Sequence, residues 1–400
     1  MALSEFAKNI PGRNLLAFPF RIFFLLTAAY AVLIVPLWLG IFFSGLISVD
    51  PVPLFIWHSH ELIFGFVLAA VAGFMLTAIC TWTGSQPLSG KYLGVVVGIW
   101  LLGRIAFLFP GVFGVKLVSL LDILFLPFLL LYVSYILFKH RNWRNLPMSC
   151  LLLLLLCANI VIHWGINTDN LILSTRGRLF SLEVILILIV LVGGRIIPAF
   201  TANWLARKGQ ERSLIKSSKL LDISCFSCLF LLLIADVFLA ATMISAYLAL
   251  LSSVLLLARL LGWKGWLTFS EPLLWVLHLG YFWVILALFL KGMGLFFPFI
   301  TPSVWIHALG LGAIGTMIIG VMTRVSLGHT GRQLKLPPYS VFSYYLITLA
   351  AICRLAYGLG IHSSAVILTI SGLAWSLGFL VFIITYWPIL TRERIDQASV

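Results

Sequence analysis

The sequence predicts an all-α, polytopic membrane protein with about twelve transmembrane helices. Hydrophobic residues make up 62% of the 400 residues and charged residues only 10%, and the mean hydropathy is +1.13. A water-soluble domain carries roughly 25% charged residues, because its surface has to be solvated. Apolar runs recur along the whole chain rather than in one segment. We therefore exclude a soluble domain with one buried helical core and expect the exterior to meet the lipid bilayer.

The helices are located by the length of the apolar runs, since a helix needs about 20 mostly apolar residues to cross the hydrocarbon core. Clusters of Pro, Gly and polar residues separate runs of this length. The expected spans are 20–43, 56–80, 92–109, 116–138, 147–166, 179–201, 217–240, 242–262, 272–296, 302–326, 338–360 and 364–388. The boundary at 240–242 is the least marked, and eleven spans are the alternative.

The basic residues orient the protein in the membrane. With the N-terminus inside, sixteen fall in cytoplasmic segments: Lys8, Arg13, Lys91, Lys139, Arg141, Arg144, Arg207, Lys208, Arg212, Lys216, Lys219, Lys264, Arg332, Lys335, Arg392 and Arg394. The outer segments hold four, which are Lys116, Arg176, Arg178 and Lys291. This asymmetry predicts that both termini are cytoplasmic (N-in/C-in). It also explains the formal charge of +14 without nucleic acid, for which no basic stripe interleaved with exposed aromatic residues is present.

The domain organisation follows from the same pattern. We expect residues 1–400 to form a single integral membrane domain. Its basic cytoplasmic loop, 202–216, predicts two six-helix halves, 18–201 and 217–388.

Histidines gather at one side of the predicted topology. Five of the eight lie at the outer ends of spans or in an outer loop: His58, His60, His163, His307 and His362. Interfaces favour polar aromatic residues, which is the alternative explanation for any single histidine. Glu61, Glu183 and Asp236 fall at similar depth, so the group as a whole predicts a shared pocket near the outer face.

The segment 57–61 offers a ligand and an orienting carboxylate. Residues two apart on a helix diverge by about 200°, whereas residues three apart share a face. His58 and Glu61 are therefore the expected pair, with the carboxylate fixing the imidazole tautomer. His60 then faces a second site, unless this turn is irregular.

The tenth span carries a stripe of small residues, Ala308, Gly312, Thr316 and Gly320. Such a stripe admits another backbone or a flat ligand, and ordinary helix packing explains it equally. His307 precedes Gly310 by one turn and could ligate a haem lying against that glycine.

Arginines inside spans are the third indication of a site. A charge at the membrane centre costs about 2.5–3.5 kcal/mol or more unless a partner meets it. Arg104, Arg195 and Arg354 lie deep in their spans. Arg195 precedes Pro198, which cannot donate to the carbonyl of Gly194, so Arg195 could pair with a propionate, a carboxylate or the freed carbonyls.

Four stretches together resemble the NnrS family of bacterial inner-membrane proteins that contain haem and copper. The stretches are 57–61 (WHSHE) with 64–66 (FGF), 73–78 (GFMLTA) with 82–84 (WTG), 195–201 (RIIPAFT), and 307–309 (HAL) leading through 312–317 (GAIGTM) to 322–332 (MTRVSLGHTGR). The similarity extends over about residues 18–390.

The resemblance implies haem, copper and a role in relieving nitric oxide or nitrosative stress during denitrification. It implies His58, His60 and His307 as metal ligands, and Glu61, Arg195 and Arg324 as further cofactor-binding residues. His163, His329 and His362 are weaker candidates for the metal.

Two functions follow as hypotheses. The first is a haem-bearing membrane protein that binds nitric oxide or a related diatomic ligand, or turns it over as a haem-dependent oxidoreductase acting on nitrogen oxides. The second is a twelve-helix secondary transporter without a redox cofactor. A haem-copper oxidase subunit requires adjacent histidines and a His-Pro-Glu segment, and the chain has neither.

Overall fold

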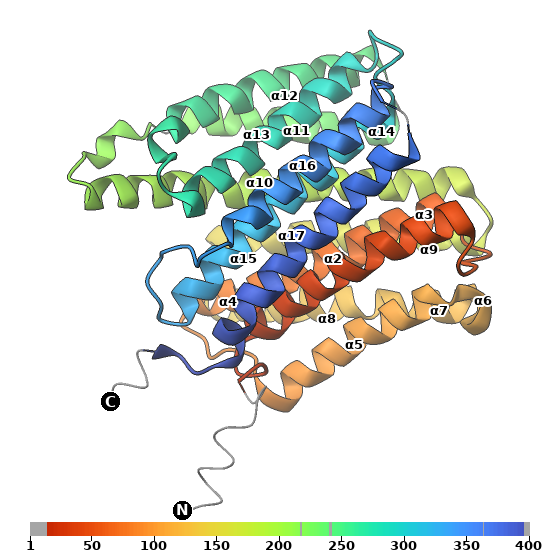
Figure 1. Ribbon diagram of the computed structural model, residues 1–400, viewed down its shortest axis with the longest axis horizontal. Helices are drawn as coiled ribbons and strands as arrows, with labels where there is room; N and C mark the ends of the chain where they lie inside the picture. Colours follow the sequence, from red (N-terminus) through yellow and green to blue (C-terminus); the bar gives the residue numbers. More distant parts are fainter. Residues whose placement is uncertain (1–13, 217, 240–241, 363, 396–400) are drawn as a thin grey trace, which may run out of the picture. The chain divides into compact units, whose positions relative to one another are not determined.

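The structure, a computed structural model, describes residues 14–216, 218–239, 242–362 and 364–395, and the regular secondary structure of this part of the chain is helical (Figure 1). Twelve helical segments in it are long and apolar enough to cross a membrane. Their number confirms the predicted fold class and span count. The seventh span ends at Phe238 and the eighth begins at Met243, so the two spans are separate. Residues 240 and 241 lie outside the described residues. Lys8 and Arg13, two of the sixteen basic residues assigned to cytoplasmic segments, also lie outside the described residues.

The first six spans contain the following helices. They are α2 (Pro19–Ser44), α3 (Leu54–His60) with η1 (Glu61–Val67) and α4 (Leu68–Thr83), α5 (Gly90–Leu108), the short α6 (Pro110–Phe113), α7 (Val115–Ile123) with α8 (Phe125–Lys139), η2 (Trp143–Asn145) with α9 (Leu146–Asn167), and α10 (Leu171–Arg207).

The last six spans follow the short turn η3 (Arg212–Leu214). They are α11 (Lys219–Phe238), α12 (Met243–Gly262), α13 (Pro272–Met293) after η4 (Gly265–Thr268), α14 (Pro302–His307) with η5 (Ala308–Gly315) and α15 (Thr316–His329), α16 (Val341–Gly358) and α17 (Ala365–Thr391).

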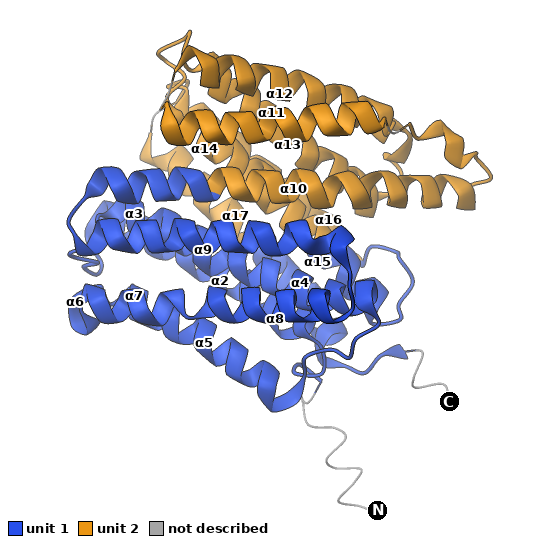
Figure 2. Cartoon of the chain, turned by 180° about the vertical axis from the view of Figure 1, so that it is seen from behind, with its two compact units in different colours: residues 1–181, 322–337, 379–400 blue, residues 182–321, 338–378 orange. Residues whose placement is uncertain are grey.

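The described chain forms two compact units (Figure 2). Unit 1 takes its residues from 1–181, 322–337 and 379–400, and unit 2 takes its residues from 182–321 and 338–378. Helices α10, α15 and α17 each contribute to both. The sequence-based division into two six-helix halves is not tested by these units and stays a prediction.

Helix α10 is much longer than the expected span 179–201, because it begins at Leu171. The Asn170 side chain accepts a hydrogen bond from the Leu173 amide (3.0 Å) and so caps the first turn. Arg178, counted in an outer segment, lies over the Phe55 ring within unit 1. The apolar run therefore marks only the lipid-facing part of a helix that continues past it.

Two spans contain a turn of π-helix, η1 directly after His60 and η5 directly after His307. A π-turn inserts one residue into the helical repeat and redirects the side chains around it, and such turns are common at functional sites. Neither turn was expected from the sequence. η1 begins at Glu61, the last residue of the segment 57–61.

Glycines on these two spans allow close helix packing. A Cβ on Gly65 would lie 2.5 Å from the Tyr30 ring of α2, and one on Gly312 would lie 2.5 Å from the Trp283 ring of α13. A Cβ on Gly320 would lie 2.9 Å from Leu277 of α13. The small-residue stripe of the tenth span therefore serves helix packing, as one of its two readings predicted.

The second and tenth spans are two copies of one pattern. The matched positions are His60 and His307, Gly65 and Gly312, Gly73 and Gly320, Met75 and Met322, and Gly84 and Gly331. Both π-turns follow the matched histidine, and both spans end at a glycine with positive φ, 70° at Gly84 and 72° at Gly331. In each copy the middle glycines face a preceding helix, α2 or α13. This pattern makes His60, rather than His58, the counterpart of His307.

Candidate metal centre

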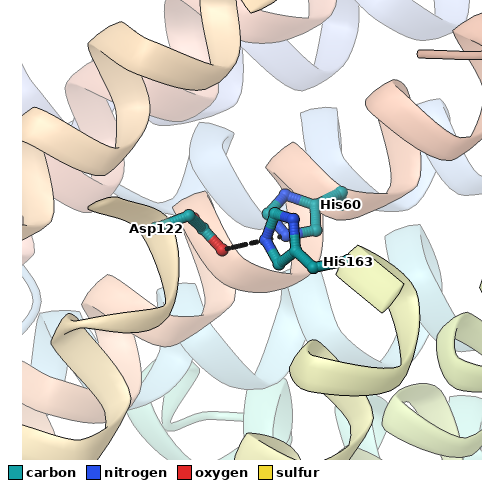
Figure 3. Close-up of side chains that lie close together, drawn as sticks. All are labelled: His60, Asp122 and His163. Atoms are coloured by element: carbon teal, nitrogen blue, oxygen red, sulfur yellow. Dashed lines mark hydrogen bonds and ion pairs between the residues drawn. The ribbon is translucent and has the colours of Figure 1, made fainter. Parts of the chain in front are cut away.

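Three potential metal ligands from three helices meet inside unit 1 (Figure 3). His60 is the last residue of α3, Asp122 lies in α7 and His163 lies in α9. Their side chains are all at least 98% buried. One nitrogen of each histidine and one carboxylate oxygen lie within 4.8 Å of one another.

The distances converge on one carboxylate oxygen. Asp122 Oδ2 lies 2.7 Å from His163 Nε2 and 3.2 Å from His60 Nε2. Ligands at about 2.0–2.1 Å from a tetrahedral ion are themselves roughly 3.3 Å apart, so only small movements would admit an ion between them. Without an ion, the same atoms form a hydrogen-bonded network in which Asn159 Nδ2 donates to Asp122 Oδ2 (2.9 Å) and Asn159 Oδ1 pairs with His60 Nε2 (3.0 Å).

Arg104 of α5 holds the acidic side chains of the cluster. Its guanidinium forms ion pairs with both Glu61 and Asp122, and all three side chains are more than 90% buried. The aromatic ring of Phe107 lies 4.1 Å from the His60 ring, nearly parallel to it, and 5.7 Å from the His163 ring. The cluster is therefore closed by an aromatic side chain and fixed by an arginine fork.

The charges of the cluster do not cancel. One guanidinium faces two carboxylates, so the group carries one net negative charge when both histidines are neutral. A buried net charge is costly in an apolar surrounding. A proton on one of these side chains or a bound cation would offset it.

The unsatisfied atoms of the cluster also fit a metal. Nδ1 of His60, Nδ1 of His163 and Oε2 of Glu61 are buried and have no hydrogen-bond partner in the described part of the chain. If Nε2 of each ring held an ion, the ring proton would move to Nδ1. On His60 this proton would face Glu61 Oε1, 3.5 Å away, which is the usual orientation of a histidine ligand by an outer carboxylate.

His60 pairs with Glu61, its Nδ1 lying 3.5 Å from Glu61 Oε1. The expected pairing of His58 with Glu61 stays a prediction. His58 is half-buried, and its ring lies 4.3 Å from the Trp38 ring.

His307 lies in unit 2 and has a fixed ring orientation. Its Nδ1 lies 2.7 Å from the Ser303 carbonyl and 3.2 Å from Ser303 Oγ. A proton on Nδ1 makes Nε2 the basic nitrogen, as in a typical histidine ligand. A Cβ on Gly310, one turn later, would meet no atom within 4 Å. The space beside this glycine is open.

A half-buried cation lies next to His307. Arg354 of α16 donates to Ser303 Oγ (3.0 Å), while its buried Nη1 has no hydrogen-bond partner among the described residues. An anionic group such as a haem propionate would satisfy this nitrogen. His307, Ser303 and Arg354 thus fit a haem at this position.

The remaining predicted residues lie elsewhere. Arg195 is half-buried in the unit 2 part of α10, and Arg324 is buried in the unit 1 part of α15. His329, at the end of α15, has its ring 5.6 Å from Phe20, and His362 is exposed. His58 and His60 belong to unit 1 and His307 to unit 2. The shared outer pocket of histidines therefore stays a prediction.

Asp122 and Asn159 belong to the centre but were not predicted from the sequence. The signal was present, because each is a polar residue inside an apolar span, and intramembrane polar residues usually mark a site. The histidine pattern drew attention to span ends, whereas these two residues are recognised only by their contacts with His60 and His163.

The twelve spans and the buried His–Asp–His group define a polytopic membrane protein with an intramembrane set of potential metal ligands. The chain belongs to the NnrS family, described as NnrS protein, which it matches over residues 14–394. No curated protein matches the chain.

Proposed function

We propose that this chain is a multi-pass protein of the bacterial inner membrane that holds haem and copper and binds nitric oxide or a species derived from it. The observation that carries the proposal is the buried His60–Asp122–His163 group. Membership of the NnrS family supports the choice of cofactors and ligand.

The donor set suits a first-row transition metal. Two imidazoles and one carboxylate are ligands that copper, iron and zinc accept, and they leave coordination positions open. His60, Asp122 and His163 would hold the ion, while Arg104, Glu61 and Asn159 would orient the ligands. When bound, the metal would supply an open position for a diatomic ligand.

The proposed haem site uses the other matched histidine. His307 would hold the haem through Nε2, with its Nδ1 near the Ser303 carbonyl. Arg354 would pair with a propionate. Bound haem would supply redox chemistry and a second position for nitric oxide.

The proposal is tested by metal analysis of the purified full-length chain. We expect haem and about one further metal ion per chain in the wild type. His163→Ala should lose most of the second metal and keep the haem, and anaerobic addition of nitric oxide should change the visible spectrum of the wild type. His140→Ala, in an exposed position outside the spans, is the matched control.

Protein without visible absorption and without bound metal would contradict the proposal and favour the transporter. Full metal occupancy in His163→Ala would contradict the assignment of the metal to this cluster.

A further inference from the structure

A second buried cluster of charges lies in unit 2. Lys291 of α13 forms ion pairs with Glu183 of α10 and with Asp236 of α11, the latter at 2.5 Å. The side chains of Lys291, Glu183 and Asp236 are 14%, 8% and 17% exposed. Lys291, counted in the outer segments on sequence grounds, is thus a partner of two acidic residues inside the helices.

The cluster has one more negative group than positive groups. The ammonium of Lys291 also lies 4.6 Å from the centre of the Trp305 ring, which strengthens the preference for a charged lysine. Lys291 and Asp236 are the charged side chains that face Glu183 from the described residues of α13 and α11. With all three groups ionised, the cluster carries one net negative charge among apolar side chains, which is costly.

The second carboxylate oxygen of Glu183 indicates where this charge is offset. Oε2 is buried and has no hydrogen-bond partner in the described chain. Glu183 and Lys291 line a cavity of about 10 Å³ whose other walls are mainly leucine and isoleucine side chains of α10 and α11. A volume of roughly 10–15 Å³ is enough for one water molecule.

We propose that Glu183 is a proton-binding site within the membrane, which takes up one proton on Oε2 and exchanges it through a water molecule in this cavity. Binding converts the carboxylate to a carboxylic acid with no other bond change and brings the cluster to zero net charge. We place the entry of protons at Asp236, which lies two residues before the end of α11 and is the most exposed of the three. Glu183, Asp236 and Lys291 are not among the proposed haem and metal ligands.

The test is infrared spectroscopy of the full-length protein in lipid nanodiscs during a pH titration. We expect the wild type to show a carboxylic acid C=O band that shifts in D2O and disappears as the pH rises. The band should be absent from Glu183→Gln. Glu211→Gln, which changes an exposed glutamate outside the spans, is the control and should keep it.

Asp236→Asn provides a second variant that does not alter Glu183. Removing a neighbouring like charge should make Glu183 release its proton about one pH unit or more lower. The band in Asp236→Asn should therefore have a lower midpoint pH than in the wild type. A lower midpoint would support proton binding at Glu183 even if Glu183→Gln proved too unstable to purify.

Three results would overturn the proposal. The first is a wild-type band that persists in Glu183→Gln, and the second is an unchanged midpoint in Asp236→Asn. The third comes from repeating the titration with sodium chloride in place of choline chloride. A midpoint that falls as sodium rises would show that a metal cation competes for the site and is its ligand.

Discussion

Arg104 joins the two carboxylates of the candidate metal centre. Removing its charge would leave Glu61 and Asp122 buried close together without a counter-charge, which costs about 3–5 kcal/mol for a broken buried pair. We expect Arg104→Met to lower the thermal stability of the purified protein strongly. Lys116→Met, which removes an exposed basic residue, should have little effect.

The double variant Arg104→Met with Glu61→Gln tests the cause. It removes one of the two uncompensated charges, so it should recover part of the lost stability. A double variant less stable than Arg104→Met alone would contradict the electrostatic account and point to lost packing.

A second prediction for a single residue concerns the partner of Arg195. If its guanidinium pairs with an anionic cofactor group, Arg195→Lys should reduce haem retention despite the conserved charge, because lysine lacks the planar fork. The measurement is the ratio of haem absorption to protein. Equal haem content with lower stability would instead assign Arg195 to the carbonyls freed by Pro198 in α10.

The matched glycines of the second and tenth spans, Gly65 and Gly312, allow a prediction about helix packing. A methyl group at Gly65 or Gly312 would press into Tyr30 or Trp283. Because overpacking costs about 1–3 kcal/mol, both Gly65→Ala and Gly312→Ala should lower the midpoint of thermal unfolding.

Gly98→Ala in α5 is the matched control, since a Cβ there meets no atom within 4 Å. It should be neutral or slightly stabilising, as alanine favours a helix. Identical midpoints for all three variants would show that the close packing of α2 on η1 and of α13 on η5 is dispensable.

The sequence predicts some features of the helices and not others. The membrane spans could be predicted, because their length and hydropathy are local properties of the chain. The π-turn after His60 could not, since periodicity along the chain does not reveal where one residue is inserted into the helical repeat. The contact between His60 and Glu61 was not predicted either. Asp122 and Asn159 belong to the centre through contacts between helices, which no spacing along the chain reveals.

At the scale of the whole molecule, the charge distribution predicts the topology. Gly209 and both termini should be cytoplasmic, and Asn170 should be periplasmic, because basic residues gather in alternate loops. Single cysteines introduced at these positions should react with a membrane-impermeant reagent only from the expected side. Labelling of residue 209 from the outside of intact cells would contradict this orientation.

We propose that His307 holds haem and that the His60 centre holds a second metal. The most direct measurement is the visible spectrum, with metal content, of the purified His307→Ala variant beside the wild type. An axial imidazole sets the spin and coordination of haem iron, so its loss should alter or abolish the haem spectrum while the second metal remains. An unchanged spectrum with full haem content would contradict the assignment and make His307 a packing residue.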